Sequence, residues 1–347
     1  MRRLGVVTLL AIAAVAPACS RASSGEPGGG SASASASASA PASTPAPASA
    51  LAPESAPALA PAPDAAVLTG PGSLTKLLDP GQPPRRKVRY AWHADQKELL
   101  LMDLATTATT EIAGSKQPEI PLPRVHVAVD VDPTRVAPDG ALSFVWRVSA
   151  ATVSAGAPGS DAMASGMRDE VAAIEHLSGR GTLTARGLAQ DVTVDAASVV
   201  DAGTTGQMVE QVRQTLRDVA VPWPEEEIGK GARWQKISQL DAKGSRLTQT
   251  DTYTLAAIDA STGTVDDVLA QTAPPQVLRT PGASSGADAR MESMLASGTS
   301  KVQFDLGRLV PRSTFDGTTT MVLSGGDVAR RITMVMHVGI GIEGKPR

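Results

Sequence analysis

The sequence is poor in cysteine, asparagine and aromatic residues. It contains one Cys, no Asn, four Trp, two Tyr and three Phe among 347 residues. A single thiol allows no disulfide within the chain. Few rings are available to stack on bases, and the formal net charge of -3 supplies no basic field for a nucleic acid. We therefore expect neither a disulfide-stabilised scaffold nor a nucleic-acid partner.

Long hydrophobic runs are also missing. The chain opens with Arg2 and Arg3, continues with an apolar run from Leu4 to Val15, and then reads Ala16-Pro17-Ala18-Cys19. The run is about a dozen residues long, whereas a membrane-spanning helix needs about 20. A basic start, a short apolar run and small residues at the end are typical of an export signal. We expect residues 1–18 to be a signal peptide that is removed.

Cys19 is the only cysteine and directly follows this signal. The stretch resembles the lipobox of bacterial lipoproteins, although Ala16 stands where the pattern has Leu and Pro17 follows it. The resemblance implies lipidation of Cys19 and a membrane anchor, and Ser20 after the Cys is compatible with the outer membrane. The alternative is ordinary cleavage after Ala16-Pro17-Ala18, which would give a soluble periplasmic or secreted protein.

Residues 19–85 consist almost entirely of Ser, Ala, Pro and Gly, including a Ser-Ala repeat from Ser31 to Ala40. Such a composition offers too little apolar bulk to offset the entropy lost on ordering. We therefore predict a disordered tether over 19–85. Residues 86–347 are left as one β-rich globular domain of a size that can bury a core.

Several segments of this domain alternate between apolar and polar residues, as half-buried strands do. One such segment runs from Val88 to Asp95, and another from Val125 to Val131. The latter should pair with Leu142–Val148 across a turn at Asp139-Gly140. The last predicted strand places six apolar residues on one face: Ile332, Met334, Met336, Val338, Ile340 and Ile342.

Two segments instead show helical spacing. Apolar residues recur every three or four positions from Met163 to Leu177, and a second series follows Thr204 and Gln207, which form a capping box. Together the patterns predict an α+β fold. We expect a curved, half-barrel-like antiparallel sheet of about ten strands, with the two helices on its concave face.

No catalytic motif is supported by its surroundings. Gly282–Gly286 reads G-x-S-x-G, but Pro281 and the neighbouring Gly and Ser predict a loop instead of a strand–turn–helix elbow. His126, Asp130 and Asp132 share a strand face that the alternating valines predict to be solvated. We predict no enzyme, no metal site and no cofactor. An envelope hydrolase remains the remote alternative.

Methionines are the most informative side chains, because Met adapts to varied apolar partners. The candidates for lining a ligand cavity are Met334, Met336, Met208, Met163 and Met167, and ordinary core filling is the alternative. Trp223 in Pro222-Trp223-Pro224 is a candidate for a loop at the pocket mouth. Its alternative role is to stiffen the crossing from helix to strand.

The stretch from Pro222 to Trp234, followed by Thr252-Tyr253-Thr254-Leu255, resembles uncharacterised bacterial lipoproteins with a domain of unknown function, found in myxobacteria and relatives. This resemblance implies no known activity. The expected layout is also similar to lipoprotein-carrier half-barrels, which shield acyl chains. We therefore expect a non-enzymatic, lipid-anchored envelope protein that binds an apolar ligand or a protein partner. The alternative is a structural or adaptor lipoprotein with a filled core.

Overall fold

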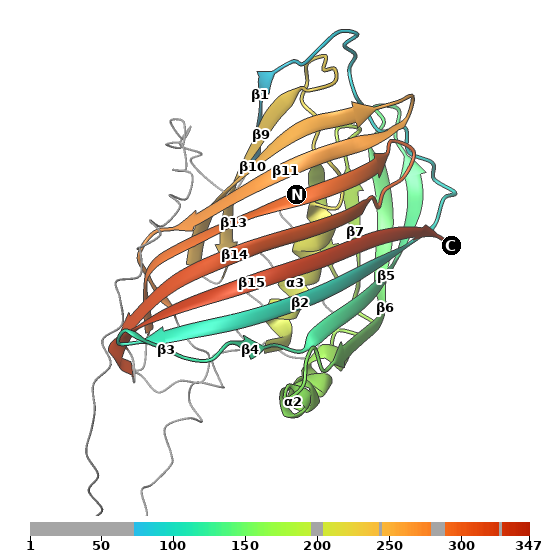
Figure 1. Cartoon of the computed structure of the whole chain (residues 1–347). Coiled ribbons are helices and arrows are strands. Elements are labelled where there is room, and N and C mark those ends of the chain that lie inside the picture. Colours follow the sequence, from blue (N-terminus) through green and yellow to red (C-terminus); the bar gives the residue numbers. More distant parts are fainter. Residues whose placement is uncertain (1–72, 196–203, 243–244, 279–288, 326–327) are drawn as a thin grey trace, which may run out of the picture. The chain divides into compact units, whose positions relative to one another are not determined.

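The domain is built on one large antiparallel sheet. The computed structural model describes residues 73–195, 204–242, 245–278, 289–325 and 328–347. In these residues the sheet follows the order β1-β9-β10-β11-β13-β14-β15-β2-β5-β6-β7-β8, and β3, β4 and β12 pair beside this path. Figure 1 shows the sheet curving around helix α3. Its two end strands, β1 and β8, do not pair with each other, so the sheet is open.

Fifteen strands of the described chain contribute to this sheet, so the prediction of about ten was too low. Several of the additional strands are only two or three residues long. The bounds are β1 Ser73–Asp79, β2 Glu98–Ile112, β3 Ser115–Lys116, β4 Ile120–Pro121, β5 Arg124–Val136, β6 Leu142–Ser154, β7 Ser178–Leu183, β8 Ala189–Val194, β9 Arg233–Ala242, β10 Ser245–Ile258, β11 Thr262–Ala273, β12 Gln276–Leu278, β13 Ala289–Asp305, β14 Arg312–Gly325 and β15 Val328–Pro346.

The β5–β6 hairpin confirms the prediction from alternating residues. The four alternating valines from Val125 to Val131 are buried and pair with the apolar face of β6, with Val131 opposite Trp146. Gly140 in the connection has a φ of 79°, a conformation that glycine adopts without a steric penalty. The Asp139 carboxylate accepts a hydrogen bond from the Ala141 amide at 3.1 Å and helps to fix the turn.

The predicted strand from Val88 to Asp95 does not form. Val88, Tyr90 and Trp92 are buried as the alternation indicates, but residues 88–95 are not part of a strand in the described structure. Two backbone amides bond instead to loops, Tyr90 to the Ala185 carbonyl and Ala91 to the Leu306 carbonyl. The segment is therefore an extended connection whose alternate side chains enter the core.

Strand β1 lies inside the range 19–85 that we predicted to be a tether. It pairs antiparallel with β9, from Ser73 opposite Ser238 to Asp79 opposite Arg233. Leu77 packs against the core, while Leu74 and Leu78 are exposed. With so few apolar residues this edge strand gave no recognisable period, so the domain boundary at residue 85 was too late.

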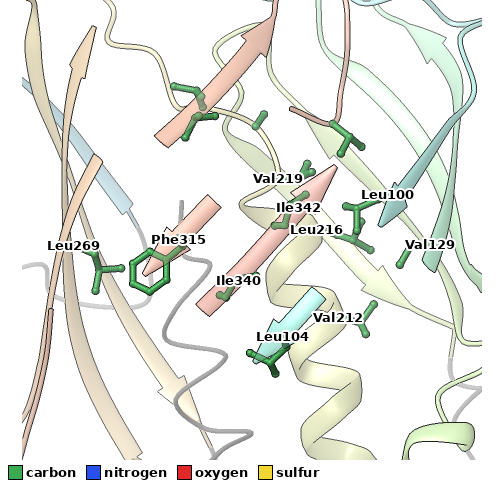
Figure 2. Close-up of a cluster of buried hydrophobic side chains, with 14 of the residues drawn as sticks. Leu100, Leu104, Val129, Val212, Leu216, Val219, Leu269, Phe315, Ile340 and Ile342 are labelled. Atoms are coloured by element: carbon green, nitrogen blue, oxygen red, sulfur yellow. The ribbon is translucent and has the colours of Figure 1, made fainter. Parts of the chain in front are cut away.

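The two helices are α2, Asp161–Ala172, and α3, Thr204–Arg217. Helix α2 packs against β6 and α3 near the end of β6 (Figure 1). Helix α3 lies within the curve of the sheet, where Val212 and Leu216 pack against β2 and β5. Figure 2 shows these side chains beside Leu100 and Val129. The apolar cavity left at this contact is only about 10 Å³, so the helix packs closely on the sheet.

Candidate ligand-binding face

The candidate site lies on the inner face of the sheet, defined here as the face that bears the buried side chains and α3. Strand register divides this face into a polar part and a methionine-rich part. The polar side chains come from β9, β10 and β11 and from the residues at the end of α3. We call Asp218, Lys236, Ser238, Gln249, Asp251 and Gln271 the inner polar cluster; each is at most 4% exposed.

An ion pair joins α3 to the sheet at this cluster. Lys236 on β9 contacts the Asp218 carboxylate at 2.9 Å, and both side chains are almost fully buried. Gln214, one turn earlier in the helix, donates a hydrogen bond to the other Asp218 oxygen at 2.7 Å. Burying two charges is costly unless they pair and form further hydrogen bonds, and here Asp218 accepts one from Gln214 in addition to the ion pair. The contact therefore fixes the end of α3 against β9.

Asp251 on β10 lies directly opposite Lys236. Its two carboxylate oxygens each accept a hydrogen bond from the Gln249 amide at 3.0 Å. Burial raises the pKa of Asp251 above its ordinary value; Lys236 and the Gln249 hydrogen bonds oppose this shift, and the Asp218 carboxylate adds to it. Burial thus disfavours the charged form of this carboxyl group, and the Gln249 hydrogen bonds and the Lys236 charge compensate in part.

Ser238 and Gln271 flank Gln249 on the two neighbouring strands. Both side chains are fully buried. Among the described residues no hydrogen-bond partner meets the Ser238 hydroxyl, the Gln271 amide nitrogen or the Gln271 carbonyl oxygen. Buried polar groups in native proteins are nearly always hydrogen-bonded, and an exception points to a bound molecule or water. These three buried atoms are therefore candidates for hydrogen bonds to a bound polar group.

The methionine-rich part lies on β13, β14 and β15. Met294 is directly opposite Met321, which is opposite Met334, so three methionines cross three adjacent strands. Met336 follows Met334 on the same face of β15, opposite Thr319. We call these four buried residues the methionine row. The register from Gln271 through Ala296 and Thr319 to Met336 covers three strand spacings, about 14 Å in all.

The predicted cavity residues are thus only partly brought together. Met334 and Met336 lie in the methionine row, whereas Met163 and Met167 are half-buried on α2, which packs against β6. Met208 belongs to α3, but its side chain is outside the described residues. Met294 and Met321 join the row although we had not proposed them as cavity residues. Cross-strand register, which the sequence does not reveal, is what unites them.

Trp223 is fully buried at the centre of an aromatic cluster and reaches no opening. Its ring lies 4.9 Å from Phe304, 5.5 Å from Trp234 and 6.3 Å from Tyr90, centroid to centroid. The Trp234 indole N–H donates to the Pro222 carbonyl at 2.7 Å. The Pro-Trp-Pro segment is therefore held against β9, an arrangement that fits a stiffening role better than a pocket mouth.

The inner polar cluster was missed at the sequence level, although β10 carried a usable signal. In its alternation Gln249 and Asp251 share a face with Leu247, Tyr253 and Leu255, and the threonines occupy the other face. The apolar members of the first face place it toward the core. Gln249 and Asp251 alternate in step with these apolar residues, so they should have been recognised as buried. Buried polar groups require hydrogen-bond partners.

A second polar arrangement lies on the outer face of the sheet. His126 on β5 contacts the Asp103 carboxylate through Nδ1 at 2.9 Å and the Ser154 hydroxyl through Nε2 at 3.2 Å. The His and Asp side chains are 40% and 58% exposed. Asp130 and Asp132 do not join them, because they pair with Arg347 and Lys97. In the part of the chain that is described, no His, Cys, Asp or Glu residues group as metal ligands.

A surface hollow of about 380 Å³ opens beside the β13–β14 connection, with Arg89, His93 and Arg308 among its lining residues. Its arginines already have acidic partners, Glu225 for Arg89 and Glu98 for Arg308. Glu98 is buried and accepts hydrogen bonds from the Leu309 and Val310 amides at 2.8 and 3.2 Å. These contacts fix the connection and leave no excess positive charge for an anion.

The chain matches no known protein-family model, and no curated protein is similar to it in sequence. The resemblance to myxobacterial lipoproteins therefore remains a prediction. Cys19 and the Gly282–Gly286 motif lie outside the described residues. Neither helix of the described chain is long and apolar enough to cross a bilayer.

Proposed function

We propose that the protein is a lipid-anchored, non-enzymatic component of the bacterial cell envelope whose sheet is a half-barrel that binds an apolar or amphiphilic ligand. The anchor is the diacylated Cys19, and the outer membrane is the proposed location. The ligand lies on the concave face, with α3 covering part of it and α2 closing one end. The layout is analogous to that of lipoprotein-carrier half-barrels, and this analogy is one of fold alone.

The observation that carries the proposal is the methionine row on the inner face of an open sheet. Met294, Met321 and Met334 lie side by side across three strands, and Met336 extends the row. Unbranched, polarisable side chains can repack around chains of different length, which rigid β-branched residues cannot. A face that served only as a fixed core would gain more from the β-branched residues that sheets favour.

Native mass spectrometry of the purified protein provides the direct test. We expect a co-purified lipid mass that organic extraction removes, after which the protein should bind the neutral probe N-phenyl-1-naphthylamine. Met334→Ala should alter probe affinity with a small stability cost, and Val335→Ala on the outer face of the same strand is the matched control. No lipid, no probe binding and a cost of about 2–5 kcal/mol for Met334→Ala would instead indicate a filled-core structural lipoprotein.

A second candidate function is hydrolysis, favoured by the contacts of His126 with Asp103 on one side and Ser154 on the other. The order of these contacts is that of a carboxylate, a general base and a hydroxyl nucleophile. Their exposure argues against this function, because water competes for each of these hydrogen bonds and weakens their electrostatic effect. Labelling of Ser154 by a fluorophosphonate, lost in His126→Ala, would favour a hydrolase. We expect no labelling.

A further inference from the structure

The inner polar cluster has a specific charge composition. Lys236 is its only basic member, and two aspartates, Asp218 and Asp251, belong to it. The Lys236 ammonium group contacts Asp218, and Asp251 lies opposite Lys236 on β10. The cluster therefore contains two carboxyl groups and one ammonium group.

The hydrogen-bonding capacity of the cluster adds a second, independent constraint. Gln271 offers an acceptor oxygen and a donor nitrogen, and Ser238 offers a hydroxyl, with no partner for these atoms among the described residues. An occupant must therefore form hydrogen bonds as well as carry positive charge. A primary ammonium group has three donors in a small volume and satisfies both requirements. A quaternary ammonium group has charge without donors, and a carboxylate or phosphate would face the aspartates.

The surroundings show where the rest of such a ligand would lie. Gln271 continues in register through Ala296 and Thr319 to Met336. Ala296 is small, and the methionine row lies beyond it on the same face. Phe315 and Ile340, which Figure 2 labels, are also buried on this face. A molecule with its polar end at Gln271 would extend its apolar part over Ala296 toward Met336.

We propose that the inner polar cluster binds the primary-amine headgroup of an amphiphile whose hydrocarbon chain lies along the methionine row. This inference rests on the proposed function, because it names the ligand class of the same face. Asp251 supplies the charge partner, and the Gln271 carbonyl and Ser238 hydroxyl accept the remaining ammonium hydrogens. The Gln271 amide nitrogen can donate to an oxygen near the amine, as in an amino alcohol.

The test compares ligands of equal chain length that differ in headgroup. Displacement of bound N-phenyl-1-naphthylamine from the delipidated protein, in the processed form that cells make, is measured with dodecylamine, dodecyltrimethylammonium, dodecanol and dodecanoate. We expect dodecylamine to bind about tenfold or more tightly than each of the others, the effect of one or two charged hydrogen bonds. n-Butylamine should displace no probe if the ligand is an amphiphile instead of a free small amine.

Two variants link this preference to the cluster. Asp251→Asn should reduce dodecylamine affinity about tenfold while dodecanol affinity stays unchanged. Asp266→Asn, at an exposed position next to Asp267, is the matched control and should change neither. Gln271→Leu provides a second readout if Asp251→Asn does not fold, since it should also lower the preference for the amine.

The outcomes separate the two proposals. Equal binding of the four amphiphiles would overturn the amine inference and leave the proposed function intact. Tighter binding of dodecanoate, or displacement by n-butylamine alone, would overturn the inference as well. Failure of the probe and of every amphiphile to bind would contradict the proposed function itself.

Discussion

Phe315 lies over Gly298, which belongs to the neighbouring strand. A side-chain carbon added to Gly298 would approach the Phe315 ring carbon Cζ to 2.0 Å and the Asp316 carbonyl oxygen to 2.7 Å. The sheet repeats this relationship elsewhere, with Phe144 against Gly181 and Phe304 against Gly263. Large rings thus occupy the space that missing side chains leave on the inner face, and each glycine is required by its aromatic neighbour.

The first prediction follows from this contact. Gly298→Ala should destabilise the domain by about 1–3 kcal/mol, because the added methyl group forces the ring or the backbone to shift. Gly339→Ala is the matched control, since the nearest atom to its added carbon is 4.0 Å away. Urea unfolding measures both. Combining Gly298→Ala with Phe315→Leu should recover part of the loss, and an additive double variant would show that the ring is not the cause.

A second prediction concerns the start of the domain. A chain beginning at Ser73 should keep the urea midpoint of the whole protein, because the composition of the preceding residues cannot form a core. A chain beginning at Arg86 lacks β1 and leaves the backbone of β9 unpaired along that edge. It should lose several kcal/mol of stability and aggregate more readily. Equal midpoints for the two chains would show that β1 contributes nothing.

Local patterns predicted the strands and helices whose period reflects one-sided burial. The β5–β6 hairpin and α3 are examples, because each presents one apolar face to the core. The segment from Val88 to Asp95 shows the limit of such patterns. Alternation reports which side chains are buried, but it does not reveal whether another strand lies within hydrogen-bonding distance. The edge strand β1 is the opposite case, paired but hardly buried.

The sequence allowed the prediction of a methionine-lined inner face, but not of all the residues that form the candidate site. Met334 and Met336 could be recognised from their shared face on the last strand. Met321 could not be assigned to them, because it depends on the register of β14 against β15. The same holds for the contact between Asp218 and Lys236, which lie 18 residues apart in separate elements. The alternation of apolar and polar residues in β10 could have placed Gln249 and Asp251 on the buried face. Placing Ser238 and Gln271 beside them required the strand pairing.

The third prediction tests the anchor. Cys19→Ala should move the protein from the membrane fraction to the soluble fraction and abolish labelling by a palmitate analogue, because it removes the thiol proposed to carry the lipid. Ser20→Ala keeps the thiol and should remain both labelled and membrane-bound. A Cys19→Ala protein that stays in the membrane fraction would contradict lipid anchoring.

The fourth prediction uses Glu98. Burial raises the pKa of this carboxyl above the ordinary glutamate value, and the Leu309 and Val310 amides and Arg308 oppose the shift. The folded state therefore binds the proton more tightly than the unfolded state, so this group's contribution is complete at low pH and is lost as pH rises through the folded-state pKa. Glu98→Gln should flatten this part of the stability profile, measured by urea unfolding between about pH 4 and pH 8.

Glu343→Gln is the control for that experiment, because its side chain is 44% exposed, whereas that of Glu98 is buried, and it should leave the profile unchanged. A profile that keeps its slope in Glu98→Gln would show that another group is responsible, with Asp251 as the next candidate since burial raises its pKa too.

The last prediction concerns Gln271 in the ligand-free protein. Its amide is fully buried, and neither polar atom has a hydrogen-bond partner among the described residues. An unsatisfied buried amide costs about 1–3 kcal/mol, which replacement by an apolar residue of similar size removes. Gln271→Leu should therefore raise the free energy of unfolding by about 1 kcal/mol or more. Gln303→Leu, at an exposed position of β13, is the control and should change stability by less than about 0.5 kcal/mol.

Adding dodecylamine should make the parent protein more stable than the Gln271→Leu variant, the reverse of their order without ligand. The ligand stabilises the parent in proportion to its affinity, and the Leu variant gains less because it has lost a hydrogen-bonding partner for the headgroup. Thermal unfolding with and without the amine measures this crossover. If Gln271→Leu is instead destabilising without ligand, the amide must already be hydrogen-bonded, for example to ordered water. The polar cluster would then be a satisfied part of the core, and its charge alone would have to account for any preference for an amine.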